Sequence, residues 1–151
     1  MNRDRRDPLQ RGFTLTELVV VLILTGVLAA VAAPLLSTTV VDEVRFHSET
    51  QAFLRYAQKT AISKRRNVCV AFTVTTVTAT ISNAFGGGCS TALTGPGGIS
   101  PYAATARGNA TFTAVPTAII FDASGAPNNP QTLLLSGSTS IVVEAGSGYV
   151  H

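Results

Sequence analysis

Residues 12–36 read GFTLTELVVVLILTGVLAAVAAPLL, and this stretch decides the fold. From Leu18 to Leu36 there is no charged residue, and Thr25 carries the only polar side chain. Nineteen residues at helical rise span about 28 Å, which is close to the hydrocarbon thickness of a bilayer. We therefore expect a single transmembrane helix over residues 13–36.

The charges on either side of this stretch predict its orientation. Residues 1–12 carry four arginines against two aspartates, and the acidic pair Asp42-Glu43 follows the apolar run. Segments rich in Lys and Arg stay on the cytoplasmic side of a membrane helix. The part of the chain after residue 36 is therefore expected on the periplasmic side of the inner membrane.

A cleaved secretory signal peptide has a similar layout, and it is the main alternative for this segment. The apolar region of a signal peptide is shorter than the run seen here. A signal peptide also gains nothing from a carboxylate such as Glu17, which lies at the start of the run, five residues after Gly12. A carboxylate at mid-membrane costs about 2.5–3.5 kcal/mol on insertion scales and less near the interface. Glu17 is therefore a candidate functional residue that needs a cationic partner, and the mature N-terminus distinguishes the two readings.

The segment Arg11–Glu17 resembles the cleavage motif of type IV prepilins and pseudopilins. The resemblance implies that a membrane-embedded prepilin peptidase cuts between Gly12 and Phe13 and methylates the new amine of Phe13. It also implies that Glu17 pairs with the Phe13 amine of a neighbouring subunit and so fixes the register between helices. The expected partners are prepilin peptidase, other pilins or pseudopilins, an inner-membrane assembly platform and the lipid bilayer.

Two residues of the membrane helix can bend it. Pro34 matches a proline that this family often carries near the end of the helix, and it removes a backbone hydrogen bond. Gly26 adds flexibility or allows close approach of another helix. Both are also tolerated as ordinary residues of membrane helices.

Residues 37–66 are predicted to form an amphipathic stalk helix. An apolar stripe runs along it at spacings of seven, four and four residues, formed by Phe46, Phe53, Ala57 and Ala61. Lys64-Arg65-Arg66 closes the helix, where cations complement the helix dipole. We expect the stripe to pack against the remainder of the chain.

After Asn67 the apolar period changes from helical to two residues, which indicates strands. A hairpin is predicted from residues 68–74 and 77–81 joined at Thr75-Thr76, followed by a loop over residues 83–101. Further strands are expected near residues 110–115, 118–122, 131–136 and 139–144, with a short edge strand at 146–150. The fold class is therefore α+β, a long N-terminal membrane and stalk helix packed on a small antiparallel β-sheet head. The expected divisions are a cleaved leader, a membrane helix, a stalk and a periplasmic head: residues 1–12, 13–36, 37–66 and 67–151.

The chain has two cysteines, Cys69 and Cys89. An even count in an exported domain favours a disulfide, which would tether the glycine-rich loop to the first strand. Two buried free thiols are the alternative.

Residues of the expected stalk and head make the resemblance to the family more specific. The pattern Ile119–Asp122 with Gly125 and Pro127, the earlier Leu54–Gln58 and the terminal Gly148–His151 are similar to the GspH/FimT group of minor pilins and pseudopilins. The cysteine pair and the Gly-Tyr-Val-His ending further resemble minor subunits of mannose-sensitive haemagglutinin-type pili. This resemblance implies a structural subunit of a type IV pilus or a type II secretion pseudopilus.

The residues argue against catalysis, cofactor binding and metal binding. The histidines, His47 and His151, form no metal-ligand spacing with the carboxylates, and no Ser-His-Asp order is present. A DNA-binding minor pilin remains the alternative, because some relatives bind DNA through arginines near the tail. The tail here has no arginine, so we expect no nucleic-acid partner and neither a cofactor nor a metal.

Overall fold

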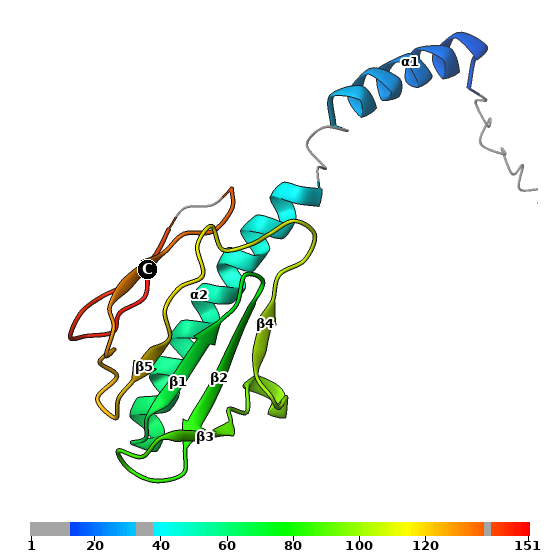
Figure 1. Cartoon of the computed structure of the whole chain (residues 1–151). Helices are drawn as coiled ribbons and strands as arrows, with labels where there is room; N and C mark the ends of the chain where they lie inside the picture. The colour runs from blue at the N-terminus through cyan, green and yellow to red at the C-terminus, as the bar shows by residue number, and fades with distance from the viewer. Residues whose placement is uncertain (1–12, 33–37, 138–139) are drawn as a thin grey trace, which may run out of the picture. The chain divides into compact units, whose positions relative to one another are not determined.

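The computed structural model describes residues 13–32, 38–137 and 140–151. The chain divides into two compact units, Met1–Ser37 and Thr38–His151, and each is considered by itself. The described part of the first unit is helix α1, Leu15–Ala32. The second unit, the head, contains helix α2, Thr38–Lys64, and all the strands (Figure 1).

Helix α1 begins with a side-chain cap. The Oγ1 atom of Thr14 accepts a hydrogen bond from the backbone N–H of Glu17 at 3.3 Å, and Leu18 donates the first helical bond to the Thr14 carbonyl at 3.1 Å. The hydroxyl of Thr25 donates to the carbonyl oxygens of Val21 and Leu22 at 2.8 and 3.1 Å. This back-bonding satisfies the one polar side chain of the apolar run inside its own helix.

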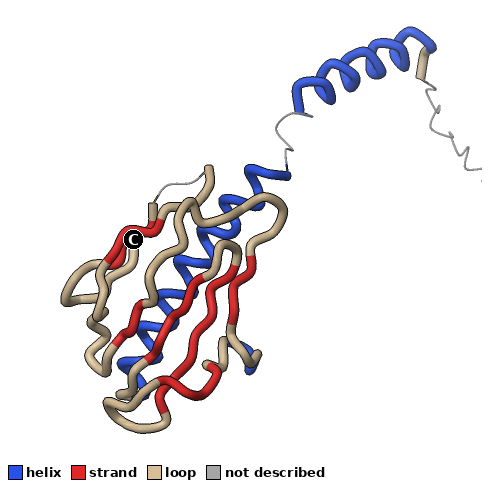
Figure 2. Tube along the Cα trace, in the orientation of Figure 1, coloured by secondary structure: helices blue, strands red, loops and turns tan. Residues whose placement is uncertain are grey.

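Helix α2 buries the stripe that the sequence predicts. Phe46, Phe53, Ala57 and Ala61 are buried, and Leu54 joins them. The helix contacts the face of the main sheet, as its crossing behind the strands in Figures 1 and 2 shows. This burial confirms the amphipathic reading of the helix.

The main sheet is antiparallel and is built around β1 and β2. Strand β1 pairs with β2 on one side and with β5 on the other, while β3 and β4 pair with different parts of the outer edge of β2. The strand bounds are β1 Val68–Phe72, β2 Thr76–Ser82, β3 Cys89–Ala92, β4 Ala103–Thr105 and β5 Ile119–Phe121, with a short 3-10 helix, Pro96–Gly98, between β3 and β4. The arrangement confirms the predicted fold class, a helix on a small antiparallel sheet.

A second small sheet joins β6, Gln131–Leu133, to β7, Ile141–Val143. The end of the chain continues this sheet, because Val142 and His151 exchange backbone hydrogen bonds of 2.7 and 3.1 Å. The core collects the inward residues of both sheets against α2. Its members from the strands include Val68, Val70, Val77, Ile119, Phe121, Leu133, Ile141 and Val143, and Val150 joins them from the end of the chain.

Three details of the head differ from the sequence prediction. The first turn spans Thr73–Thr76 instead of Thr75-Thr76, because Thr73 donates its N–H to the Thr76 carbonyl at 2.9 Å and its hydroxyl accepts from Thr76. The stretch 83–101 is not a continuous loop, since it contains β3 and the 3-10 helix. Residues 110–115 form no strand, although Ala110 and Phe112 are buried as the alternation suggested.

The physical reason lies in where the backbone hydrogen bonds of these segments go. Phe112 donates to the Val74 carbonyl and Thr113 donates to the Leu134 carbonyl, so adjacent residues of this stretch bond to different parts of the chain. Strands β3 and β4 read CSTA and AAT, which carry no apolar alternation, and pairing with β2 holds them in place. Tertiary pairing overrides the local sequence pattern at these sites.

Candidate functional site

The N-terminal segment presents an apolar cylinder with one charge. Every described residue of α1 is exposed, and Glu17, in its first turn, is the only charged residue between Phe13 and Ala32. A carboxylate at this end of a helix lies near the partial positive charge of the unpaired N–H groups. Phe13 precedes the Thr14 cap and is 81% exposed.

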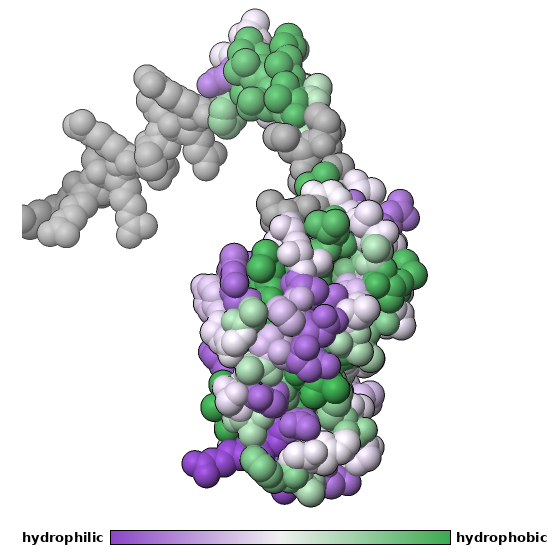
Figure 3. Space-filling model, turned by 60° about the vertical axis from the view of Figure 1, so that its left-hand side comes forward, coloured by the Kyte–Doolittle hydropathy of each residue, from purple (hydrophilic) through white to green (hydrophobic). Residues whose placement is uncertain are grey.

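By length and composition, α1 is the one helix in the described residues that can cross a membrane. Its 18 residues span about 27 Å, close to the thickness of the bilayer core. In Figure 3 its visible surface is almost uniformly hydrophobic, whereas the visible face of the head mixes hydrophobic and hydrophilic residues. Nothing lies within 4 Å of a side-chain position at Gly26, and the predicted kink there stays a prediction. Gly12, the leader 1–12 and Pro34 lie outside the described residues.

Helix α2 holds three loops of the head through one short segment. Arg55 donates its Nε–H to the Val150 carbonyl at 3.0 Å, and the Tyr56 hydroxyl donates to the Thr94 carbonyl at 2.9 Å. Gln58 donates from Nε2 to the Ser147 carbonyl at 2.7 Å and approaches that of Gly125 at 3.4 Å. The exposed Arg55 and the half-buried Tyr56 and Gln58 therefore anchor loops, while Leu54 and Ala57 of the same turn pack in the core.

The turn after β5 is closed by Asp122. Its Oδ1 accepts hydrogen bonds from the Ser124 hydroxyl at 2.6 Å, the Ser124 N–H at 2.8 Å and the Ala126 N–H at 3.0 Å. The Ser124 hydroxyl is the main cause of a lowered pKa of the Asp122 carboxyl, because hydrogen bonds to the ionised form favour it. Gly125, in the same turn, has φ of +86° and lies against Ile62 of α2.

Cys69 and Cys89 are joined by a disulfide with a Cα–Cα distance of 6.0 Å. The bond connects β1 to the start of β3 and closes the segment that holds the triple glycine. Asn67 adds a second tether, because its Nδ2 donates to the Gly87 carbonyl at 3.2 Å. The loop over residues 83–88 is therefore fixed to the end of α2 and the start of β1.

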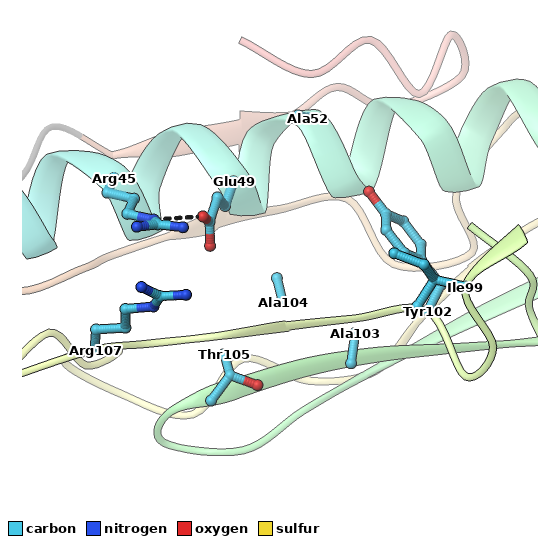
Figure 4. A pocket seen from close by; sticks show the side chains of 9 residues that line it. All are labelled: Arg45, Glu49, Ala52, Ile99, Tyr102, Ala103, Ala104, Thr105 and Arg107. Atoms are coloured by element: carbon cyan, nitrogen blue, oxygen red, sulfur yellow. Dashed lines mark hydrogen bonds and ion pairs between the residues drawn. The ribbon is translucent and has the colours of Figure 1, made fainter. Parts of the chain in front are cut away.

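A cavity of about 590 Å³ lies between α2 and β4 (Figure 4). Arg45 and Glu49 line it from the helix as an ion pair of 2.7 Å, and Arg107 lines it from the segment after β4. Burial is the main cause of a raised pKa of the Tyr102 phenol at one end. An arginine does not titrate in proteins, so the Arg45–Glu49 pair is a structural ion pair and not an acid–base couple.

The described residues contain no group of three or more His, Cys, Asp or Glu side chains that could hold a metal ion. His151 contacts Glu144 at 2.9 Å on an exposed surface at the end of the chain. The other histidine, His47, lies in α2. Among the described residues, therefore, no cluster of three such side chains lies beside the cavity.

Sequence reasoning missed two features of these sites. The Thr14 cap has the spacing of Ser or Thr followed three residues later by Glu, which is a recognised signal for a helix start. The anchoring role of Arg55 and Gln58 has no local signal, because their partners lie between 67 and 95 residues further along the chain.

Two family models match this chain. The model of the prokaryotic N-terminal methylation motif matches residues 8–33, and the model of the type II transport protein GspH matches residues 48–148. No curated protein and no solved structure gives a significant match. The two matched segments contain the capped apolar helix α1, the anchoring segment Leu54–Gln58 and the disulfide. They also contain the turn at Thr73–Thr76 and the turn that Asp122 closes.

Proposed function

The chain belongs to the GspH family of type II transport proteins, and we propose that it is cut after Gly12 and assembled through α1 into a filament. It is a minor pilin or pseudopilin of type II secretion or type IV pili, a structural subunit and not an enzyme. Members of these families are processed by prepilin peptidase and assemble with other pilins. The finer assignment to mannose-sensitive haemagglutinin-type pili stays a prediction.

The observation that carries the proposal is a single carboxylate at the start of a fully exposed apolar helix. The methylation-motif match over residues 8–33 includes both the expected cut between Gly12 and Phe13 and the carboxylate, Glu17. An amine on Phe13 would stand directly before the Thr14 cap, at the same end of the helix as Glu17. Cleavage there therefore creates a cation at the end of the helix where the anion already lies.

The expected role of Glu17 is to pair with the N-methylated Phe13 amine of an adjacent subunit. A charge buried among apolar helices is costly alone, and removing one partner of such a pair typically costs 3–5 kcal/mol. Pairing between subunits neutralises both groups and fixes the axial position of one helix against the next. Because the interaction needs a second subunit, α1 of a lone chain shows only an exposed carboxylate.

The membrane arrangement follows from the same segment. We place α1 across the inner membrane and the basic leader on the cytoplasmic side, with the stalk helix over residues 37–66 and the β-rich part over residues 67–151 on the periplasmic side. The Cys69–Cys89 disulfide supports this placement, because disulfides persist in the periplasm and are rare in the cytoplasm. The inner-membrane assembly platform and other pilins are the proposed partners.

The experiment is intact-mass analysis of the membrane-extracted chain, followed by recovery of assembled filaments. We expect a mature chain that begins at N-methyl-Phe13. A mature N-terminus beyond Ala33, as a secretory cleavage would leave, would overturn the proposal.

Glu17→Gln tests the assembly step separately, since it keeps the shape of the side chain and removes its charge. We expect this variant to be processed normally and to be depleted from filaments at least tenfold, as the loss of a buried ion-pair partner predicts. Thr25→Val is the matched control, because the Thr25 hydroxyl bonds only to carbonyls of its own helix. Equal incorporation of Glu17→Gln and Thr25→Val would contradict the pairing role.

A further inference from the structure

Helix α2 ends with an arginine in a backbone conformation that favours glycine. Arg65 has φ of +51° and is the one non-glycine residue of the described chain with a positive φ. Arg66 donates its N–H to the Ala61 carbonyl at 3.1 Å, and Arg65 donates to the Ile62 carbonyl at 3.3 Å. This is the Schellman pattern of hydrogen bonds, in which the left-handed position is usually glycine. An arginine therefore stands where the backbone alone would favour glycine, and a strained residue of this kind is a reason to look for a use of its side chain.

The three side chains at this helix end form a cationic cluster without internal neutralisation. No ion pair or side-chain hydrogen bond involves Lys64, Arg65 or Arg66 within the described ranges, and the two arginines are exposed. Asp122 lies near this end, because Val68 pairs with Phe121 across β1 and β5. Its carboxylate is occupied by hydrogen bonds within its own turn.

A loop that is bonded to the residue after the cluster carries an exposed aromatic ring. Phe85 is 79% exposed in the loop over residues 83–88. The bond from Asn67 to the Gly87 carbonyl places this loop against the residue that follows Arg66. The disulfide fixes the other end of the loop, so Phe85 is presented on a tethered segment.

We infer that Lys64, Arg65, Arg66 and Phe85 form one docking surface, the helix-end surface, for an acidic patch on another protein subunit of the assembly. In the bound state the cations pair with carboxylates, and Phe85 enters an apolar pocket of the partner. The inference rests on the proposed function, because it requires an assembly of several subunits. It goes beyond it by assigning a contact of the head that is separate from the packing of α1.

The chemistry favours a protein partner over a nucleic acid or a membrane. Arginine and aromatic side chains carry most of the binding energy in protein interfaces. Single-stranded nucleic acids use a longer cationic groove with several aromatic rings, and anionic membranes attract clusters of four to eight cations. Upstream, the exposed Lys59 lies five residues before Lys64 on α2. Downstream, the next cation, Arg107, lines the cavity beside Arg45 and does not extend the cluster.

The test replaces Phe85 with the photoreactive residue p-benzoylphenylalanine in the full chain, in cells that assemble the filament. The adducts formed on irradiation are mapped by peptide mass spectrometry. We expect residue 85 to be joined to an Asp- or Glu-rich peptide of another pilin-family subunit, and adducts with any other protein alone would count against the inference. Adducts with lipid or nucleic acid alone, with a peptide that lacks carboxylates, or no adduct would each overturn the inference.

Arg65→Gly is the decisive variant, because it removes the charge while relieving the backbone. We expect it to lower the adduct yield at least fivefold, as the loss of an interface arginine predicts. We also expect it to raise the melting temperature of the detergent-solubilised chain by about 4 °C. Arg107→Gln makes the same change of charge elsewhere on the head, and it should leave the yield unchanged.

An unchanged yield in Arg65→Gly, or a fall in its melting temperature, would overturn the inference. Measuring the intact mass of the chain in the same samples distinguishes a failure of this inference from a failure of the proposed function. A chain processed at Gly12 that gives no adduct contradicts only the helix-end surface, whereas an unprocessed chain contradicts the proposed function.

Discussion

Two glycines in the turn after β7 differ in a way that allows a controlled stability prediction. Gly146 and Gly148 have φ of +75° and +64°, so an alanine at either position meets the same backbone penalty. A side-chain carbon at Gly146 would have nothing within 4 Å, whereas one at Gly148 would lie 2.1 Å from the Gly125 carbonyl oxygen. At Gly148 it would also lie 2.9 Å from Nε2 of Gln58.

The two substitutions therefore separate backbone strain from packing. A non-glycine residue in the left-handed region costs about 1–2 kcal/mol, and this is the whole expected effect of Gly146→Ala. Gly148→Ala must in addition displace a backbone carbonyl, which costs about 1–3 kcal/mol as overpacking. It also disturbs the hydrogen bonds that Gln58 donates to Gly125 and Ser147, each with a net value of about 1 kcal/mol. We expect Gly148→Ala to destabilise the head by about 2–5 kcal/mol through strain and overpacking, and by up to about 2 kcal/mol more if both hydrogen bonds are lost.

The measurement is urea unfolding of the full chain in detergent micelles, followed by tyrosine fluorescence. The chain has three tyrosines and no tryptophan, and all three tyrosines lie in the head, so the signal excludes α1. The midpoint of Gly148→Ala should fall well below that of Gly146→Ala at an unchanged slope. Equal midpoints for the two variants would refute the close packing of this turn against Gly125.

Three further predictions use the same unfolding assay. Thr50 has a fully buried Oγ1 with no hydrogen-bond partner, so the isosteric Thr50→Val should stabilise the head by about 1 kcal/mol, and a destabilised variant would show that the hydroxyl is satisfied. Reducing the disulfide between Cys69 and Cys89, 20 residues apart, should cost about 3 kcal/mol in the chain-entropy model, whereas an unchanged midpoint would remove its stabilising role. Asp122→Asn should destabilise the head at pH 7, and the difference in unfolding free energy from wild type should close as the pH falls below about 4. The pKa of Asp122 is lowered in the folded state, so its carboxylate stabilises the head above the unfolded-state pKa and this stabilisation is lost on protonation. A difference between wild type and Asp122→Asn that does not vary with pH would contradict the hydrogen-bonded carboxylate.

The sequence was most informative where the decisive residues are contiguous. The apolar run and its leading carboxylate lie within one helix, so hydropathy, spacing and the motif locate them without any tertiary information. The buried stripe of α2 was readable for the same reason, since helical period alone selects Phe46, Phe53, Ala57 and Ala61. The strands β3 and β4 could not be predicted from the sequence, because neither carries an apolar alternation and each is ordered by pairing with β2.

The long-range contacts of α2 explain why the surface of the head could not be derived residue by residue. Arg55 is exposed, Tyr56 and Gln58 are half-buried, and the three bond to carbonyls of the loops after β3, β5 and β7. The buried neighbours Leu54 and Ala57 fix the same helical turn against the sheet. Because side chains from one helical turn bond to all three loops, the positions of these loops depend on contacts that the loops' own residues do not encode.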